Sequence, residues 1–228
     1  VQTCALPICI YGANYKLAIF MTLFIQTFRY AAEPFIFSHY KTDDSRELYA
    51  VIMKTFIIVG LLIFLGISMY LNLFRIFIGE EFYEGLHIVP ILLIANLFLG
   101  INYNLGFWYK LREKTRYGAY VSIAGALITI GANIVFIPVL GYEGAAWATL
   151  ICYVGMALLN FYWGRKHYRI PYDIKSALLY IALALILFFI ATNVTDKTNV
   201  FSYIIRTVFI LFFISVVGLK ERKLLKSF

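Results

Sequence analysis

The sequence predicts an all-α protein, a polytopic membrane bundle of about seven transmembrane helices. Of its 228 residues, 62% are hydrophobic and only 14% are charged, and the mean hydropathy is +0.82. Soluble domains carry roughly 25% charged residues. Apolar runs of about 20 residues, long enough to cross a bilayer as helices, recur along the chain. This composition excludes a sizeable soluble domain, a secreted disulfide scaffold and a nucleic-acid-binding protein.

Each predicted helix is an apolar run bounded by polar clusters. In chain order the runs are 15–37, 50–71, 86–108, 117–139, 142–164, 174–193 and 201–219. Strands of an outer-membrane barrel would alternate apolar and polar residues, whereas stretches such as 57–67 are apolar throughout. Helices are therefore favoured. We expect residues 1–10 to be non-native or disordered, 11–219 to form the helical lobe and 220–228 to form a basic cytoplasmic tail.

The lysines and arginines predict the orientation, because cytoplasmic loops hold an excess of them. One set of alternate loops and helix ends contains fifteen: Lys41, Arg46, Lys54, Lys110, Arg112, Lys114, Arg116, Arg165, Lys166, Arg169, Lys175, Lys220, Arg222, Lys223 and Lys226. The other set contains three: Lys16, Arg75 and Lys197. The net charge of +8 is thus mainly a topology signal, with the C-terminus in the cytoplasm and the N-terminus outside. Since no signal peptide precedes the first span, we expect an odd number of spans to have preceded it in a longer parent chain.

The first span carries the strongest candidate site. Thr22, Gln26, Arg29 and Glu33 are spaced so that they share one helical face. An ionised group at membrane depth is costly unless it faces a bundle interior or water, and arginine suits a phosphate. This pattern predicts a polar cavity wall. It is also compatible with a structural ion pair, since Arg29 and Glu33 can pair at i and i+4.

Other polar positions within the spans are ambiguous between a hydrophilic path and hydrogen bonds between helices. They are Asn96 and Asn104, then Ser122, Thr129 and Asn133, and then Thr149, Tyr153 and Asn160. Gly144, Ala148 and Cys152 form a small-residue stripe that predicts close helix packing. Arg206, near the outer end of the last span, is expected to extend to the membrane interface.

No catalytic pattern is recognisable, so we expect a protein that is not an enzyme and has no cofactor or metal. The histidines, His39, His87 and His167, have no metal-ligand spacing around them. Gly-rich phosphate loops and nucleophile elbows are missing from the sequence. Asp43 and Asp44 adjoin basic residues, which is typical of a solvated loop.

The stretch 106–172 resembles the C-terminal half of polysaccharide flippases, the lipid-linked oligosaccharide (O-antigen type) exporters of the multidrug/oligosaccharidyl-lipid/polysaccharide exporter superfamily. The resemblance is carried by WYK at 108–110, Lys114-Thr115, Asn133 through Ile137-Pro138 to Gly141, 144–146, Ala148-Thr149, and AAEPFIFSH at 31–39. It extends over about 11–228.

The resemblance implies one lobe of a two-lobe exporter in a bacterial inner membrane. Its partners would be a lipid-linked oligosaccharide, membrane lipids and the N-terminal lobe of the parent chain. The parent would move a polyprenyl diphosphate sugar outward by alternating access, for surface polysaccharide or lipopolysaccharide biosynthesis. Arg29 would then contact the head group, with Gln26, Glu33 and Asn133 as neighbours. Glu33 could couple transport to an ion.

Three alternatives remain open. A multidrug or cation exporter of the same superfamily would favour an acidic cavity, and Glu33 is the one clear acid within a span. A membrane enzyme acting on lipid-linked sugars would need a catalytic group in a sizeable loop, and the loops are short. A seven-helix receptor is suggested by the helix count alone.

Overall fold

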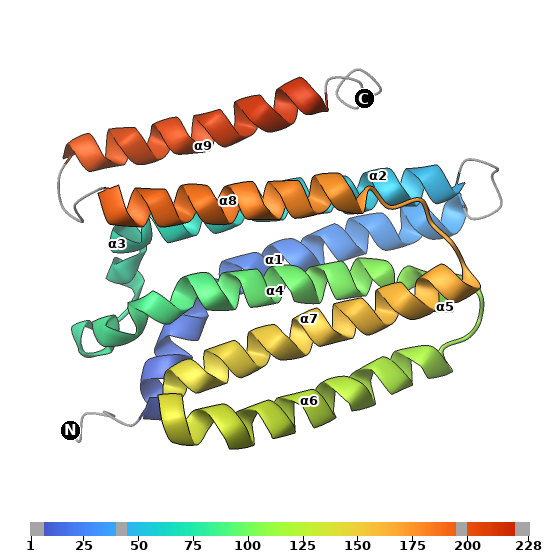
Figure 1. The fold of residues 1–228 in the computed structure, drawn as a ribbon, viewed down its shortest axis with the longest axis horizontal. Helices are drawn as coiled ribbons and strands as arrows, with labels where there is room; N and C mark the ends of the chain where they lie inside the picture. The colour runs from blue at the N-terminus through green and yellow to red at the C-terminus, as the bar shows by residue number, and fades with distance from the viewer. Residues whose placement is uncertain (1–6, 40–44, 195–199, 222–228) are drawn as a thin grey trace.

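The computed structural model describes residues 7–39, 45–194 and 200–221. Within these ranges the chain forms helices and no strands, and the long helices lie along a common axis (Figure 1). Seven helical segments are long and apolar enough to cross a membrane. The predicted all-α membrane bundle is thereby confirmed.

The helix bounds follow the predicted spans closely. The long helices are α1 (Pro7–Ser38), α2 (Ser45–Met69), α4 (Val89–Leu105), α6 (Arg116–Leu140), α7 (Tyr142–His167), α8 (Ile174–Val194) and α9 (Val200–Lys220). The short ones are α3 (Leu71–Phe74), η1 (Arg75–Phe77), η2 (Glu80–Ile88) and α5 (Phe107–Leu111). The predicted run 86–108 corresponds to the end of η2, α4 and the start of α5.

The first helix begins earlier than its apolar run indicated. α1 begins at Pro7 rather than near residue 15, because Asn14 and Lys16 interrupt the hydrophobic pattern without interrupting the helix. Proline is well placed at a first helical position, where its missing N–H is not needed. Residues 7–10 of the segment expected to be non-native thus belong to α1, and residues 1–6 lie outside the described ranges.

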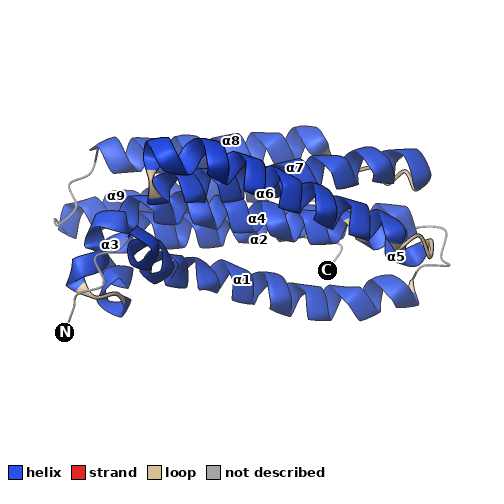
Figure 2. Ribbon diagram, turned by 90° about the horizontal axis from the view of Figure 1, so that it is seen from below, coloured by secondary structure: helices blue, strands red, loops and turns tan. Residues whose placement is uncertain are grey.

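Helix α4 forms the centre of the bundle. It packs against α1, α2 and α7, and Leu92, Leu93 and Leu97 are completely buried there. α6 and α9 lie at opposite edges (Figure 1), and α1 and α8 lie on opposite faces (Figure 2). These leucine side chains fill the space between α4 and its neighbouring helices, as the close packing of protein interiors requires.

Buried asparagines tie α4 to its neighbours. Asn96 Nδ2 donates to the Ala18 carbonyl of α1 at 3.4 Å, and Asn160 Nδ2 of α7 donates to Asn102 Oδ1 at 2.8 Å. Asn96 and Asn160 are 0% and 1% exposed. In these two positions the asparagine therefore joins helices, which is a common role in membrane bundles.

The small-residue stripe on α7 allows close helix packing, as the sequence predicted, and the structure identifies the neighbouring helix as α6. A methyl group on Gly144 would overlap the backbone of Phe136, and Cys152 Sγ donates to the Gly125 carbonyl at 3.3 Å. Gly141 joins the two helices with φ of +58°, a conformation that glycine adopts without strain. α6 and α7 thus form a close antiparallel pair.

The basic segments of the chain gather at one end of the bundle, which we call the basic end. The end of α1, the start of α2, the α5–α6 turn, the α7–α8 link and the end of α9 all lie there (right side of Figure 1). The start of α1, η2 and the α6–α7 turn lie at the opposite end. The loops and helix ends that are rich in lysine and arginine thus lie at one end of the bundle, and those that are poor in them lie at the other, as the alternation along the sequence indicates.

Arg206 of α9 does not extend outward, and that expectation was wrong. Its side chain is only 6% exposed, and Nη1 donates to the Met69 carbonyl at the end of α2 at 2.7 Å. The guanidinium also lies over the Tyr203 ring, 5.6 Å from its centroid. The last carbonyls of a helix have no partner within it, so the α2 terminus supplies an acceptor for this buried cation.

Candidate functional site

A polar stripe runs along most of α1. Thr22, Gln26, Arg29 and Glu33 lie on one face, as predicted, and each is partly exposed. Tyr11 and Tyr15 lie 11 and 7 residues before Thr22 and extend the same face toward the opposite end of the bundle. We call these six residues the α1 stripe.

Three other elements supply polar groups beside the α1 stripe. Thr149 of α7 lies 3.4 Å from Tyr11, oxygen to oxygen. Tyr153, four residues after Thr149, lies on the same face of α7. Figure 2 shows α1 on the face of the bundle away from α7 and α8, with α4 between. The α1 stripe thus borders a surface to which α4 contributes Tyr103, α5 contributes Lys110, and α7 contributes Thr149 and Tyr153.

Arg29 is held by aromatic rings. Its guanidinium carbon lies 5.2 Å from the centroid of Tyr103 and 5.7 Å from that of Tyr30, within the range of a cation–π interaction. Among the described residues it forms no ion pair, and its buried Nε has no hydrogen-bond partner. Tyrosine faces position the cation but do not neutralise its charge.

Glu33 pairs with Lys110 of α5 rather than with Arg29. The expected i, i+4 pair does not form, because the ammonium of Lys110 reaches the carboxylate from the neighbouring element, leaving Arg29 to the Tyr103 ring. Glu33 and Lys110 side chains are 26% and 36% exposed. The charged part of the site therefore contains two cations and one carboxylate, a net charge of +1.

Asn133 lies apart from this group. It belongs to α6, which packs against α7 and α5 and forms no extensive interface with α1. Its Oδ1 is buried without a hydrogen-bond partner among the described residues. The structure thus brings Gln26, Arg29 and Glu33 together on one helix but does not bring Asn133 to them.

Sequence reasoning missed Lys110, Tyr103 and the two tyrosines of α1 as members of this surface. The spacing of Tyr11 and Tyr15 was a usable signal, since it continues the period of the stripe. Lys110 gave no such signal. It lies 77 residues from Glu33, in a basic segment between two predicted spans, where a lysine is expected simply to face water.

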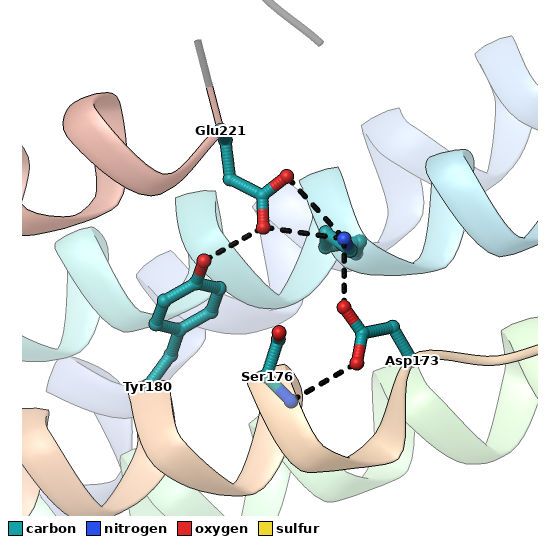
Figure 3. A network of polar contacts seen from close by, with 5 residues as sticks. Asp173, Ser176, Tyr180 and Glu221 are labelled. Atoms are coloured by element: carbon teal, nitrogen blue, oxygen red, sulfur yellow. Dashed lines mark hydrogen bonds and ion pairs between the residues drawn. The ribbon is translucent and has the colours of Figure 1, made fainter. Parts of the chain in front are cut away.

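A second polar centre joins three segments at the basic end (Figure 3). Lys54 Nζ of α2 lies 3.0 Å from Asp173 Oδ2 and 3.2 Å from Glu221 Oε1. Tyr180 of α8 donates to Glu221 at 2.7 Å, and the Ser176 N–H donates to Asp173 at 3.2 Å. A hydrogen bond from the Ser176 side chain first, and then that from Lys54, lower the pKa of Asp173 to about 2, and the Ser176 N–H adds to this effect. This network fastens the α8–α9 pair to α2.

Within the described ranges, no three His, Cys, Asp or Glu side chains are grouped so as to hold a metal ion. No protein-family model, curated protein or solved structure significantly matches the chain.

Proposed function

We propose that this chain is the C-terminal part of a membrane transporter that flips lipid-linked oligosaccharide across a bacterial inner membrane. The parent protein would work by alternating access between two lobes, and the surface along the α1 stripe would border the substrate path. The basic end would face the cytoplasm, consistent with the excess of lysine and arginine there. The sequence resemblance and the geometry around Arg29 support this proposal.

The observation that carries it is the half-buried guanidinium of Arg29, which lies on a polar face of a membrane-spanning helix and has no ion-pair partner among the described residues. An unneutralised cation at that depth is unfavourable unless water or an anion approaches it. The diphosphate of a polyprenyl diphosphate sugar is such an anion, and the planar guanidinium can donate two parallel hydrogen bonds to it. Lys110, next to Glu33, adds a second cation at the basic end of the same face.

The pairing of Glu33 also favours this proposal over a multidrug or cation exporter. A cationic substrate or a coupling ion requires a carboxylate free to receive it, whereas Glu33 already contacts the ammonium of Lys110. The surface keeps a net positive charge, which attracts an anion and repels a cation. A cation exporter would therefore require Lys110 to leave Glu33 during transport.

Replacement of Arg29 in the full-length protein tests the proposal. Arg29→Ala should reduce surface polysaccharide by at least tenfold in cells whose export depends on this protein, and Arg29→Lys should restore part of it, because the charge returns without the donor fork. Immunoblotting of surface polysaccharide and of the membrane-inserted protein provides the measurement.

Arg75→Ala is the matched control. Arg75 is exposed at the opposite end of the bundle, where it lies over Tyr83, 5.3 Å from the ring centroid, and its loss should leave export unchanged. Normal polysaccharide in cells with the Arg29→Ala protein would reject Arg29 as a substrate contact. Drug resistance conferred by the full-length protein, without polysaccharide export, would reject the flippase proposal itself.

A further inference from the structure

A histidine joins two segments at the end of the bundle opposite the basic end. His87, in the last turn of η2, places Nε2 2.8 Å from Glu143 Oε1, in the first turn of α7. Its other ring nitrogen, Nδ1, lies 2.7 Å from the Glu84 carbonyl, one turn back along η2. η2 and the start of α7 lie together at this end (Figure 1). We call the contact between His87 and Glu143 the His87 clasp.

Both partners of the His87 ring can only accept a hydrogen bond. A carbonyl oxygen has no hydrogen to donate, and neither has an ionised carboxylate. The neutral ring carries one N–H and satisfies one partner, which leaves a nitrogen lone pair against the other acceptor. The imidazolium carries two N–H groups and donates to both. The hydrogen bonds around His87 are therefore complete only when the ring is protonated.

His167, at the basic end, provides the contrast. Its Nδ1 lies 3.0 Å from the Trp163 carbonyl, and its Nε2 lies 3.0 Å from the hydroxyl of Tyr117. A phenol can donate as well as accept, so the neutral ring donates through Nδ1, accepts at Nε2 and leaves neither nitrogen unpaired. The need for a second proton at His87 thus comes from its particular partners.

The ionisable groups of η2 and α7 that lie closest to His87 are two carboxylates and a phenol. Glu143 belongs to α7, and Glu84 lies three residues before His87, on the same face of the 3₁₀ helix. The ring centroid of Tyr142 lies 6.0 Å from that of His87, and a phenol is neutral near pH 7. Both elements thus bring negative charge toward the ring.

The other described neighbours of η2 bring no charge to this ring. α1 meets η2 at Asn14, and Lys16, two residues further on, lies on another side of that helix. α4 has no ionisable residue from 89 to 102. Arg75 lies over the ring of Tyr83, which is a third of a turn from the histidine around η2. The imidazole is therefore the group of this contact whose charge changes near neutral pH.

We infer that His87 is a proton-binding site and that the bound proton holds η2 against the start of α7. In the neutral ring, Nδ1–H donates to the Glu84 carbonyl and the Nε2 lone pair faces the Glu143 carboxylate. Nε2 takes a proton from water, which the 48% exposed side chain can reach, and donates it to Glu143. Histidine titrates between about pH 5 and 8, so the clasp is favoured at pH 5.5 and weakened at pH 8.

The His87 clasp acts where three segments of the bundle meet. α1 reaches η2 through Asn14, Nδ2 of which donates to the Phe82 carbonyl at 2.9 Å, and reaches α7 through Tyr11, 3.4 Å from Thr149. His87 closes the third side, between η2 and α7. Of these three contacts, that of His87 is the one that responds to a proton near neutral pH. The proposed orientation decides only which side of the membrane supplies the proton.

Distances between two spin labels test the clasp in the purified chain in detergent. In a background without Cys4, Cys9 and Cys152, labels are attached through Glu80→Cys in η2 and Val139→Cys near the end of α6, both exposed positions. Double electron–electron resonance then gives the populations with short and long separations. The ratio of short to long should be about two- to fivefold higher at pH 5.5 than at pH 8, the range of an exposed ion pair.

Variants of the clasp identify the groups responsible. His87→Gln takes up no proton and should give the same distances at both pH values, whereas His87→Arg, charged at both, should keep the short separation at both. Glu143→Gln should remove most of the pH response while the histidine stays in place. His39→Gln is the matched control: its exposed ring lies at the basic end, and its loss should leave the response unchanged.

Distances that are the same at pH 5.5 and pH 8 in the wild type would overturn the inference. A pH response that persists in His87→Gln protein would assign the proton to another group, and one that persists unchanged in Glu143→Gln protein would reject Glu143 as the acceptor. Circular dichroism and size-exclusion profiles identify a variant that fails to fold, and the remaining variant then decides. None of these measurements depends on flippase activity, so they succeed or fail independently of the proposed function.

Discussion

Single residues in this bundle show that a charge within or beside a membrane span is satisfied in different ways. Arg29 lies over tyrosine rings, Arg206 donates to a helix-terminal carbonyl, and Lys54 meets two carboxylates. Only the last two place an acceptor against the cation. Arg29 is therefore the one of these three that keeps its charge available to a ligand.

Asp173 provides a pH prediction at this scale. Its folded pKa of about 2 lies below the usual value of about 3.9, so folding favours the ionised carboxylate. Its contribution is present above about pH 4 and is lost as the pH falls toward 2. Because the side chain is 43% exposed, we expect less than about 1 kcal/mol.

Thermal unfolding of the purified protein in detergent measures this contribution. Asp173→Asn should lower the melting temperature at pH 6, and the difference from wild type should shrink as the pH falls from 4 to 2. Glu80→Gln, which removes an exposed carboxylate from η2, serves as the control and should show no such pattern. A difference that stays constant over this pH range would contradict the prediction.

Among the elements, the α6–α7 pair depends most on small residues. Gly144 lies against the backbone of Phe136, which cannot move aside as a flexible side chain could. By contrast, nothing lies within 4 Å of where a methyl group on Gly131 would project. The two glycines therefore separate the effect of close packing from that of helix propensity.

Gly144→Ala should destabilise the protein by about 1–3 kcal/mol, the usual range for overpacking, because α6 must move away from α7. Gly131→Ala should leave stability unchanged or raise it slightly, since alanine favours the helix. Unfolding in detergent, followed by circular dichroism, distinguishes the two. Equal effects of the two substitutions would show that α6 does not pack at the predicted distance.

For the whole molecule, hydropathy and charge alternation were sufficient to predict the seven spans. The pairing partners were not predictable, because they depend on packing between distant segments. The sequence offered only Arg29 as a partner for Glu33, and the placement of α5 near the end of α1 brings Lys110 to it instead. Lys54 was counted only as a cation near a loop, since its partners Asp173 and Glu221 are distant in sequence and meet it only in the folded bundle. The family resemblance placed Asn133 beside Arg29, whereas α6, which carries Asn133, packs against α7 and α5 and not extensively against α1.

The orientation proposed for the bundle can be tested at both ends. In a background without Cys4, Cys9 and Cys152, Glu84→Cys should react with a membrane-impermeant thiol reagent in intact cells, because η2 would face outward. Lys166→Cys, at the basic end, should react only after the membrane is permeabilised. Mass-shift labelling records both, and the reverse pattern would invert the proposed topology.

The contact between Lys54 and Glu221 has a consequence for how the chain is made. The two residues are 167 positions apart, and a ribosome synthesises the lysine first, at roughly 5–20 residues per second. During the intervening seconds, α2 has left the ribosome while both carboxylates of the network are still missing. In that interval the Lys54 ammonium must reach the lipid head groups by extending its stem. Its final position is therefore acquired late, when α8 and α9 arrive and the last part of the bundle assembles.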